Sequence, residues 1–238
     1  MWLKWSCSEG WNGGVMTIEA SVGSMFSGKT LDMLCRVISK EKGGLEWGVD
    51  YIIFNHGSDT RYGVNVIAAH ANEGKIQAPA VAVNDSFELL NHICDWVDDG
   101  WCLKEGFKGL RDLFIDEAQF FDDDLVQVVD YIDRVLGVDV MVAGLDTDFR
   151  GEPFPGPIPG LLAVADKVIK HKAGCQCVGK CGNGATRTQR IVDGVPAGYH
   201  DEIFFVGAEE AYEARSKGHH EFRQDDPKPV PFTDRFSK

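Results

Sequence analysis

Short apolar runs and stretches of helical periodicity alternate along the first two thirds of the chain. Strand-like runs, each bounded by polar or turn residues, lie at residues 16–22, 51–54, 80–83, 113–115 and 138–143. Helical periodicity, with an apolar side chain at every third or fourth position, follows Thr30 and recurs at 87–97 and 125–136. Strands that are apolar on both faces and separated by helices are typical of parallel sheets. The pattern therefore predicts an α/β domain with helices flanking a parallel sheet.

The sequence changes character in its second half. Residues 151–160 are dominated by Pro and Gly, so we expect no regular structure there. Beyond residue 171 the chain is rich in Cys, Gly and His and holds two short strand candidates, at 190–192 and 203–206. Met1 and Met16 are both candidates for the first translated residue. We predict an irregular leader at 1–15, an α/β domain at 16–170, a small module at 171–222 and a flexible tail at 223–238.

The charge balance is strongly acidic. The 238 residues include 24 Lys and Arg against 37 Asp and Glu, a formal net charge of −13. Such a field repels phosphate backbones, so we expect no general binding to nucleic acid. No apolar run reaches the roughly 18 residues that a membrane-spanning helix needs, and polar side chains interrupt the first residues too early for a secretory signal. We expect a cytoplasmic protein with no membrane partner.

A glycine-rich turn follows the first predicted strand. Its sequence, GSMFSGKT, matches the phosphate-loop pattern and has the strand before it and the helix after it that the motif requires. The glycines let backbone N–H groups face a polyphosphate, and the helix presents the positive end of its dipole. Lys29 would bind the β- and γ-phosphates of ATP, and the Thr30 hydroxyl would ligate Mg²⁺. The predicted nucleotide-binding residues are Gly23, Ser24, Met25, Phe26, Ser27, Gly28, Lys29 and Thr30.

A second motif stands at the end of the strand predicted at 113–115. The strand runs directly into Asp116, Glu117, Ala118 and Gln119. Ligands of parallel sheets bind at the carboxyl ends of the strands, so these carboxylates should face the nucleotide. We assign Asp116 and Gln119 to the ATP and Mg²⁺ site, and Glu117 to the general base that deprotonates a hydroxyl or water. The two motifs predict a nucleoside-triphosphate enzyme but leave the phosphate acceptor open.

Five segments, in order, resemble the type II thymidine kinases, which phosphorylate deoxythymidine with ATP. The segments are 23–30, 59–62 with His70, 115–121, 144–154 and 185–190, within a similarity that runs from Met16 to His220. The resemblance implies a P-loop-type parallel sheet flanked by helices, with a small zinc-binding lasso module. It also implies a homotetramer that makes dTMP and ADP in pyrimidine deoxynucleotide salvage. We expect deoxyuridine as a second substrate, because a methyl group in an apolar pocket contributes only about 1 kcal/mol.

The resemblance also implies roles for single residues. Glu117 aligns with the catalytic base, which takes the proton of the nucleoside 5′-hydroxyl. Arg61 aligns with a residue that steadies the transferring phosphate, while we interpret Arg187 and Arg190 as structural residues that support the lasso. The residues implied to enclose the thymine ring are Phe120, Leu145, Phe149, Phe154 and, on the loop that closes over the base, Tyr212.

Three cysteines of the second module lie within seven residues, and histidines follow later in the module. Thiolate and imidazole are the ligands that zinc prefers. The resemblance implies two knuckles with two ligands each, but here Ser216 stands in place of a thiolate, and a hydroxyl is a poor zinc ligand. His220 as the fourth ligand, and free thiols without zinc, stay open as alternatives. We predict a structural Cys₃His zinc site made of Cys175, Cys177, Cys181 and His219.

Two other functions fit part of the sequence. The acidic motif at 116–119 is similar to that of helicases, so a DNA-dependent P-loop ATPase is the alternative function. Such motors pair two α/β lobes of about 150–200 residues each, and this chain is too short for them. A non-catalytic zinc-binding module that keeps ATP for stability is the third candidate. The presence of Lys29, Thr30, Asp116 and Glu117 together argues against it.

Overall fold

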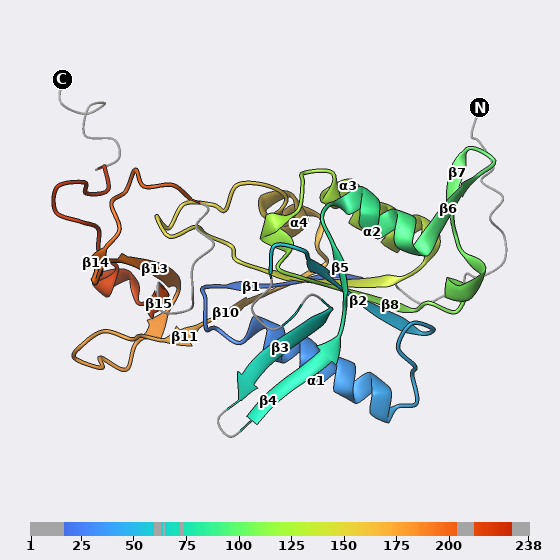
Figure 1. Ribbon diagram of the computed structural model, residues 1–238, viewed down its shortest axis with the longest axis horizontal. Helices are drawn as coiled ribbons and strands as arrows, with labels where there is room; N and C mark the ends of the chain where they lie inside the picture. Colours follow the sequence, from blue (N-terminus) through green and yellow to red (C-terminus); the bar gives the residue numbers. More distant parts are fainter. Residues whose placement is uncertain (1–16, 60–62, 64, 72–73, 204–211, 230–238) are drawn as a thin grey trace. The chain divides into compact units, whose positions relative to one another are not determined.

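The computed structural model describes residues 17–59, 63, 65–71, 74–203 and 212–229 (Figure 1). The chain separates into two compact units, which are described one at a time. The first, called the sheet unit, comprises the residues up to 22 together with 28–146 and 154–170. The second, called the lasso unit, comprises 23–27, 147–153 and the residues from 171 onward.

The sheet unit is built on a six-stranded parallel sheet with the strand order β10–β1–β9–β8–β2–β5. This confirms the predicted fold class. Its strands are β1 (Ile18–Gly23), β2 (Tyr51–His56), β5 (Val81–Val83), β8 (Asp112–Asp116), β9 (Asp139–Gly144) and β10 (Lys167–His171). In the parallel register, Val22 of β1 pairs with Gly144 of β9, and Asn55 of β2 pairs with Asp116 of β8. The carboxyl ends of these strands therefore meet at one edge of the sheet, where α/β proteins bind their ligands.

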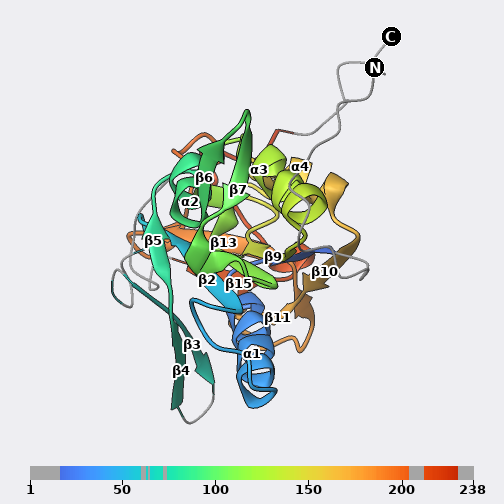
Figure 2. The ribbon, with the colours of Figure 1, turned by 90° about the vertical axis from the view of Figure 1, so that its right-hand side faces the viewer.

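Helices cover both faces of this sheet (Figure 2). Helix α1 (Lys29–Lys42) packs on one face through Met33, Leu34 and Val37, as does the hairpin of β3 (Val66–Ala71) and β4 (Gly74–Pro79). The other face is covered by α2 (Ser86–Ile93), α3 (Leu125–Tyr131), which continues as a π-helix over Ile132–Leu136, and α4 (Ile158–Val164). Successive strand residues enter opposite cores: Ile52 and Phe54 lie in one, Tyr51 and Ile53 in the other. Both cores are apolar, which explains the continuous apolar strands in the sequence.

The prediction of a helix at 87–97 is wrong for residues 94–97. Helix α2 ends at Ile93, and β6 (Cys94–Val97) pairs with β7 (Gly100–Leu103) in a hairpin. Lys104 directs its ammonium at the carbonyl oxygens of Asn91 and His92, at 2.5 and 3.2 Å. A cation at these last carbonyls favours an early end of the helix.

The prediction of no regular structure at 151–160 is also wrong for residues 158–160. Helix α4 begins at Ile158, directly after Pro157, and has Pro159 in its first turn. A proline is tolerated there because the first N–H groups of a helix have no partner within the helix. In the sheet unit, the strands β3, β4, β6, β7 and β10 were not predicted from the sequence.

The lasso unit consists of short antiparallel pairs. Strand β13 (Arg187–Val192) pairs with β14 (Val195–Pro196) and with β15 (Tyr212–Arg215), and β11 (Ala173–Gly174) pairs with β12 (Gly184–Ala185). The strand predicted at 190–192 is thus the end of β13. The strand predicted at 203–206 lies outside the described residues after Ile203. Within the described ranges, no helix is long and apolar enough to cross a membrane.

Candidate active site and metal site

The glycine-rich turn connects β1 to α1, as predicted. Gly23 has a φ of 152°, and a Cβ there would lie 2.7 Å from the carbonyl oxygen of His171, so no larger residue fits. Gly28 has a φ of 90° and is the N-cap of α1. It has no side chain to satisfy the first N–H groups of the helix, which leaves them for an anion. The Met25 N–H donates to the Thr188 hydroxyl at 3.1 Å, which anchors the turn within the lasso unit.

The end of β8 contacts the first turn of α1. The Thr30 hydroxyl donates to Oδ2 of Asp116 at 3.0 Å, and Oδ1 of Asp116 accepts from the Glu117 N–H at 3.0 Å. Asp116 is only 4% exposed. Burial and the negative charge of Glu117 raise the pKa of Asp116 to about 7, although the positive charge of Lys29 acts against this. A buried carboxylate at this position, beside a hydroxyl, is a ligand set suited to a divalent cation.

Glu117 lies on a strained turn directly after β8. Its backbone is left-handed, with φ of 52° and ψ of 38°. A residue other than glycine in this conformation costs roughly 1 kcal/mol, and such strain concentrates at functional sites. Its carboxylate accepts a hydrogen bond from Nε2 of Gln119 at 2.5 Å.

Three of the residues implied to enclose a base belong to the sheet unit. Phe120 lies in the short 3₁₀-helix at Ala118–Phe120 and makes an edge-to-face contact with Phe154, with ring centroids 6.3 Å apart. The Leu145 N–H donates to the side chain of Gln119. His56, at the end of β2, also packs against Phe120, with ring centroids 6.0 Å apart. His56, which the sequence interpretation did not single out, has both ring nitrogens bonded within the sheet unit, to the Asn84 carbonyl oxygen at 2.9 Å and the Ser58 N–H at 3.2 Å.

The two others belong to the lasso unit, where Arg190 connects them. The Arg190 guanidinium lies 5.4 Å from the ring centroid of Phe149, and Arg190 pairs with Tyr212 across β13 and β15. A Cβ at Gly151 would lie 2.8 Å from the guanidinium nitrogen Nε of Arg187. Both arginines thus lie against the loop at 147–153, and their structural role stays a prediction. Arg61 lies outside the described residues.

The predicted zinc ligands come together in the lasso unit. The Sγ atoms of Cys175, Cys177 and Cys181 and a ring nitrogen of His219 all lie within 4.8 Å of one another. A tetrahedral zinc site with Zn–S bonds of about 2.3 Å places its ligand atoms about 3.8 Å apart, so the four atoms fit a zinc ion after a small contraction. Backbone N–H groups also point at the sulfurs, as in zinc knuckles: that of Cys181 donates to Cys177 at 3.3 Å.

Ser216 and His220 take other places around this cluster. The Ser216 N–H donates to Sγ of Cys175 at 3.2 Å, and its hydroxyl lies 3.1 Å from Nδ1 of His219. Burial opposes ionisation of the Cys175 thiol, but hydrogen bonds with the Ser216 amide and hydroxyl lower its pKa to about 6. His220 points elsewhere, with Nε2 at 2.8 Å from the carbonyl oxygen of Phe149. Of the two histidines, His219 is thus the one placed to ligate a metal.

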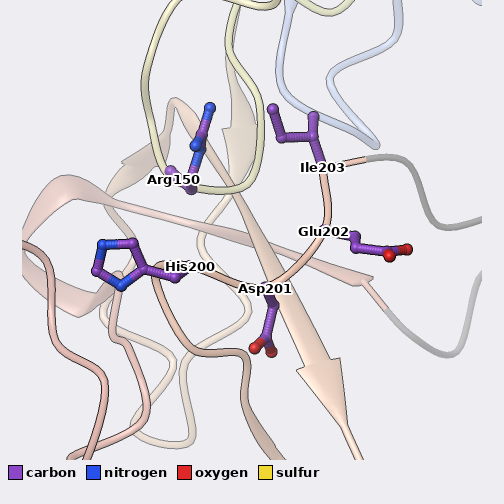
Figure 3. Close-up of a pocket in the computed structure, with 5 residues that line it drawn as sticks. All are labelled: Arg150, His200, Asp201, Glu202 and Ile203. Carbon is purple, nitrogen blue, oxygen red and sulfur yellow. The ribbon is translucent and has the colours of Figure 1, made fainter.

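An open hollow of about 440 Å³ in the lasso unit is lined by Arg150, His200, Asp201, Glu202 and Ile203 (Figure 3). The side chains of His200, Asp201 and Glu202 point in different directions and share no common centre. Two of the polar groups have partners of their own, since Arg150 pairs with Asp148 and His200 with Asp226. The hollow therefore lacks the convergent polar groups of a ligand site.

One comparison with known proteins agrees with this geometry. The family model described as thymidine kinase matches residues 16–220, most of the chain. The match includes the phosphate loop, the acidic motif after β8 and the four clustered metal-ligand candidates. Kinases of this kind act on ATP and a nucleoside. The chain belongs to the thymidine kinase family.

Proposed function

We propose that this kinase transfers the γ-phosphate of ATP to the 5′-hydroxyl of deoxythymidine, giving dTMP and ADP, in deoxynucleotide salvage. The observation that carries the proposal is the 3.0 Å hydrogen bond between Thr30 and Asp116. It joins the phosphate-loop helix to the acidic strand end, and the next residue is the candidate base Glu117.

The proposed nucleotide site is the turn at 23–30. Its N–H groups would bind phosphate oxygens, and Lys29 would bind the β- and γ-phosphates. Thr30 and Asp116 would hold Mg²⁺, since hydroxyl and carboxylate oxygens are its preferred protein ligands. When bound, the ion supplies positive charge that neutralises the phosphates. Asp116 is buried, and a cation bound beside it would favour its ionised carboxylate.

Glu117 is the proposed catalytic base. The 5′-oxygen attacks the γ-phosphorus, the bond to the β–γ bridging oxygen breaks, and the hydroxyl proton passes to the Glu117 carboxylate. Phosphoryl transfer depends mainly on positioning and charge neutralisation, so one oriented carboxylate suffices.

The thymine ring is proposed to bind among apolar side chains, which contribute affinity by burial. The edge-to-face pair of Phe120 and Phe154 supports this assignment for the sheet unit. Deoxyuridine, which lacks only the methyl group, would be a second substrate. The proposed nucleoside-binding residues are Phe120, Leu145, Phe149, Phe154, Tyr212 and, for the phosphate, Arg61.

A structural zinc ion on the Cys₃His cluster, and a homotetramer, complete the proposal. The zinc assignment rests on the four ligand atoms within 4.8 Å. The tetramer rests on the family resemblance, and light scattering of the purified protein would test it.

A radiolabel-transfer assay tests the function. The purified chain, with γ-labelled ATP and Mg²⁺, is offered each of the four natural deoxynucleosides and deoxyuridine. We expect label on deoxythymidine, and on deoxyuridine with modest discrimination. Label released only as inorganic phosphate, at a rate raised by single-stranded DNA, would instead support the helicase-type ATPase.

A further inference from the structure

The side-chain amide of Gln119 connects two segments of the sheet unit. Its Nε2 donates to Oε2 of Glu117 at 2.5 Å, and its Oε1 accepts from the Leu145 N–H at 3.0 Å. A backbone N–H can only donate and a carboxylate can only accept, so these two partners fix which end of the amide faces which. Gln119 is 1% exposed. Both ends of a buried amide are thus bonded within the protein.

Packing holds this amide in place. Gly144, the last residue of β9, lies against it: a Cβ at this position would be 2.8 Å from Oε1 of Gln119 and 2.8 Å from Cδ1 of Ile158. The glycine leaves room for the amide oxygen to reach the Leu145 N–H directly after the strand. The amide therefore ties the turn after β8 to the end of the neighbouring strand β9.

The Glu117 carboxylate, which Gln119 contacts, needs a partner that holds it in one orientation. Glu117 has a left-handed backbone on a turn, and its long side chain can adopt several rotamers. Catalysis by a carboxylate depends on its orientation, and a misplacement of about 1 Å can cost about a hundredfold in rate. A fixed donor on one carboxylate oxygen restricts the side chain to few orientations.

We propose that Gln119 is a positioning residue, which orients the Glu117 carboxylate toward the acceptor hydroxyl by linking it to the backbone of Leu145. This inference rests on the proposed function, in which Glu117 is the base. It assigns Gln119 to the acceptor side of the reaction through Glu117, and not to direct contact with the nucleotide. Gly144 contributes to this positioning, because the lack of a side chain there leaves space for the Gln119 amide.

The test replaces Gln119 with methionine, which matches its length but offers neither hydrogen bond. We expect kcat for deoxythymidine to fall by about 10- to 100-fold, with the KM values for Mg·ATP and deoxythymidine within about threefold of the wild type. Gln127→Met, at an exposed position of α3, is the matched control and should leave both constants unchanged. A raised KM for Mg·ATP with kcat preserved would place Gln119 in the nucleotide site and overturn the inference.

A double-mutant cycle separates positioning from a merely structural role. In a Glu117→Gln background, measured by label transfer over hours, adding Gln119→Met should change the residual kcat by less than about twofold, because the group it orients is gone. An equal loss in both backgrounds would overturn the inference.

A second variant covers the case in which Gln119→Met fails to fold. Gln119→Glu keeps an acceptor for the Leu145 N–H but turns a carboxylate oxygen toward Glu117, so at pH 8 kcat should again fall at least about tenfold. A kcat of the wild-type value in this variant would overturn the inference about Gln119 but leave the proposed function standing. A wild-type chain that labels no nucleoside in the same assay would instead overturn the proposed function, and the inference with it.

Discussion

The hydroxyl of Thr30 and the carboxylate of Asp116 are joined by a 3.0 Å hydrogen bond, although 86 residues separate them in the chain. The parallel register of β1, β9 and β8 produces this contact, because it brings the carboxyl ends of all three strands to the same edge. Asp116 is buried at this edge. This creates a carboxyl group whose ionisation is costly in the free protein and favoured in the presence of a cation.

The first prediction concerns the pH dependence of stability. The pKa of Asp116 is raised from 3.8 to about 7, so between these values the folded protein holds a proton that the unfolded chain releases. Its contribution to stability is therefore full below pH 3.8 and is lost as the pH rises through about 7. In Mg²⁺-free buffer, the free energy of unfolding of the wild type should therefore fall between pH 5 and pH 8 relative to that of Asp116→Asn. Urea unfolding at both pH values measures this, and a constant difference would contradict it.

The second prediction concerns Asp122, which binds the first residue of α2. Its carboxylate accepts from the N–H and the hydroxyl of Ser86 at 2.8 and 2.6 Å. Partial burial acts to raise the pKa of Asp122, but these hydrogen bonds lower it overall. Asp122→Ala should lower the free energy of unfolding at pH 7 by about 1 kcal/mol, and the loss should shrink as the pH falls below 3.8. Asp123→Ala, at an exposed neighbour, is the control and should change little.

A third prediction concerns Gly144. Gly144→Ala brings a methyl group within 2.8 Å of Gln119 and Ile158, so we expect a loss of about 1–3 kcal/mol in the free energy of unfolding. Gly106→Ala, where the added Cβ meets nothing within 4 Å, should stay within about 0.5 kcal/mol of the wild type. Chemical denaturation of both variants checks this. Equal stabilities would mean that the end of β9 tolerates a side chain.

The fourth prediction concerns the metal. The purified protein should contain about one equivalent of zinc, and Cys177→Ser should lose it, because a hydroxyl is a poor zinc ligand. Cys35→Ser changes an exposed cysteine outside the cluster and should retain the metal. The cluster is bonded to β15, whose first residue is Tyr212, so its loss should weaken nucleoside binding more than ATP binding, as isothermal titration would measure. Less than one equivalent after gentle purification would contradict the zinc site.

The phosphate loop and the acidic strand end could be predicted because each is a local pattern at a strand terminus. The early end of α2 could not, because Lys104, which bonds the carbonyls of Asn91 and His92, lies 13 and 12 positions further along the chain. The periodicity of residues 94–97 fits a helix, but their pairing with β7 determines the structure. Tertiary contacts thus override local preference where the local signal is weak.

The choice between His219 and His220 shows the same limit at the metal site. The two are adjacent in sequence, and only the 3₁₀ turn at Lys217–His219 directs the first toward the cysteines, while the second bonds the Phe149 carbonyl. The link from Gln119 to Leu145 spans 26 residues and depends on the space at Gly144. No spacing rule in the sequence indicates such a contact.

The role of Glu117 is tested most directly by comparing Glu117→Gln with the wild type in label transfer to deoxythymidine and in ATP binding. The amide keeps the shape of the side chain but cannot accept the proton of the 5′-hydroxyl. We expect kcat to fall by about 10²–10⁴-fold with the dissociation constant for Mg·ATP little changed, and Glu105→Gln, at an exposed position, to behave as the wild type. Undiminished turnover by Glu117→Gln would contradict the account.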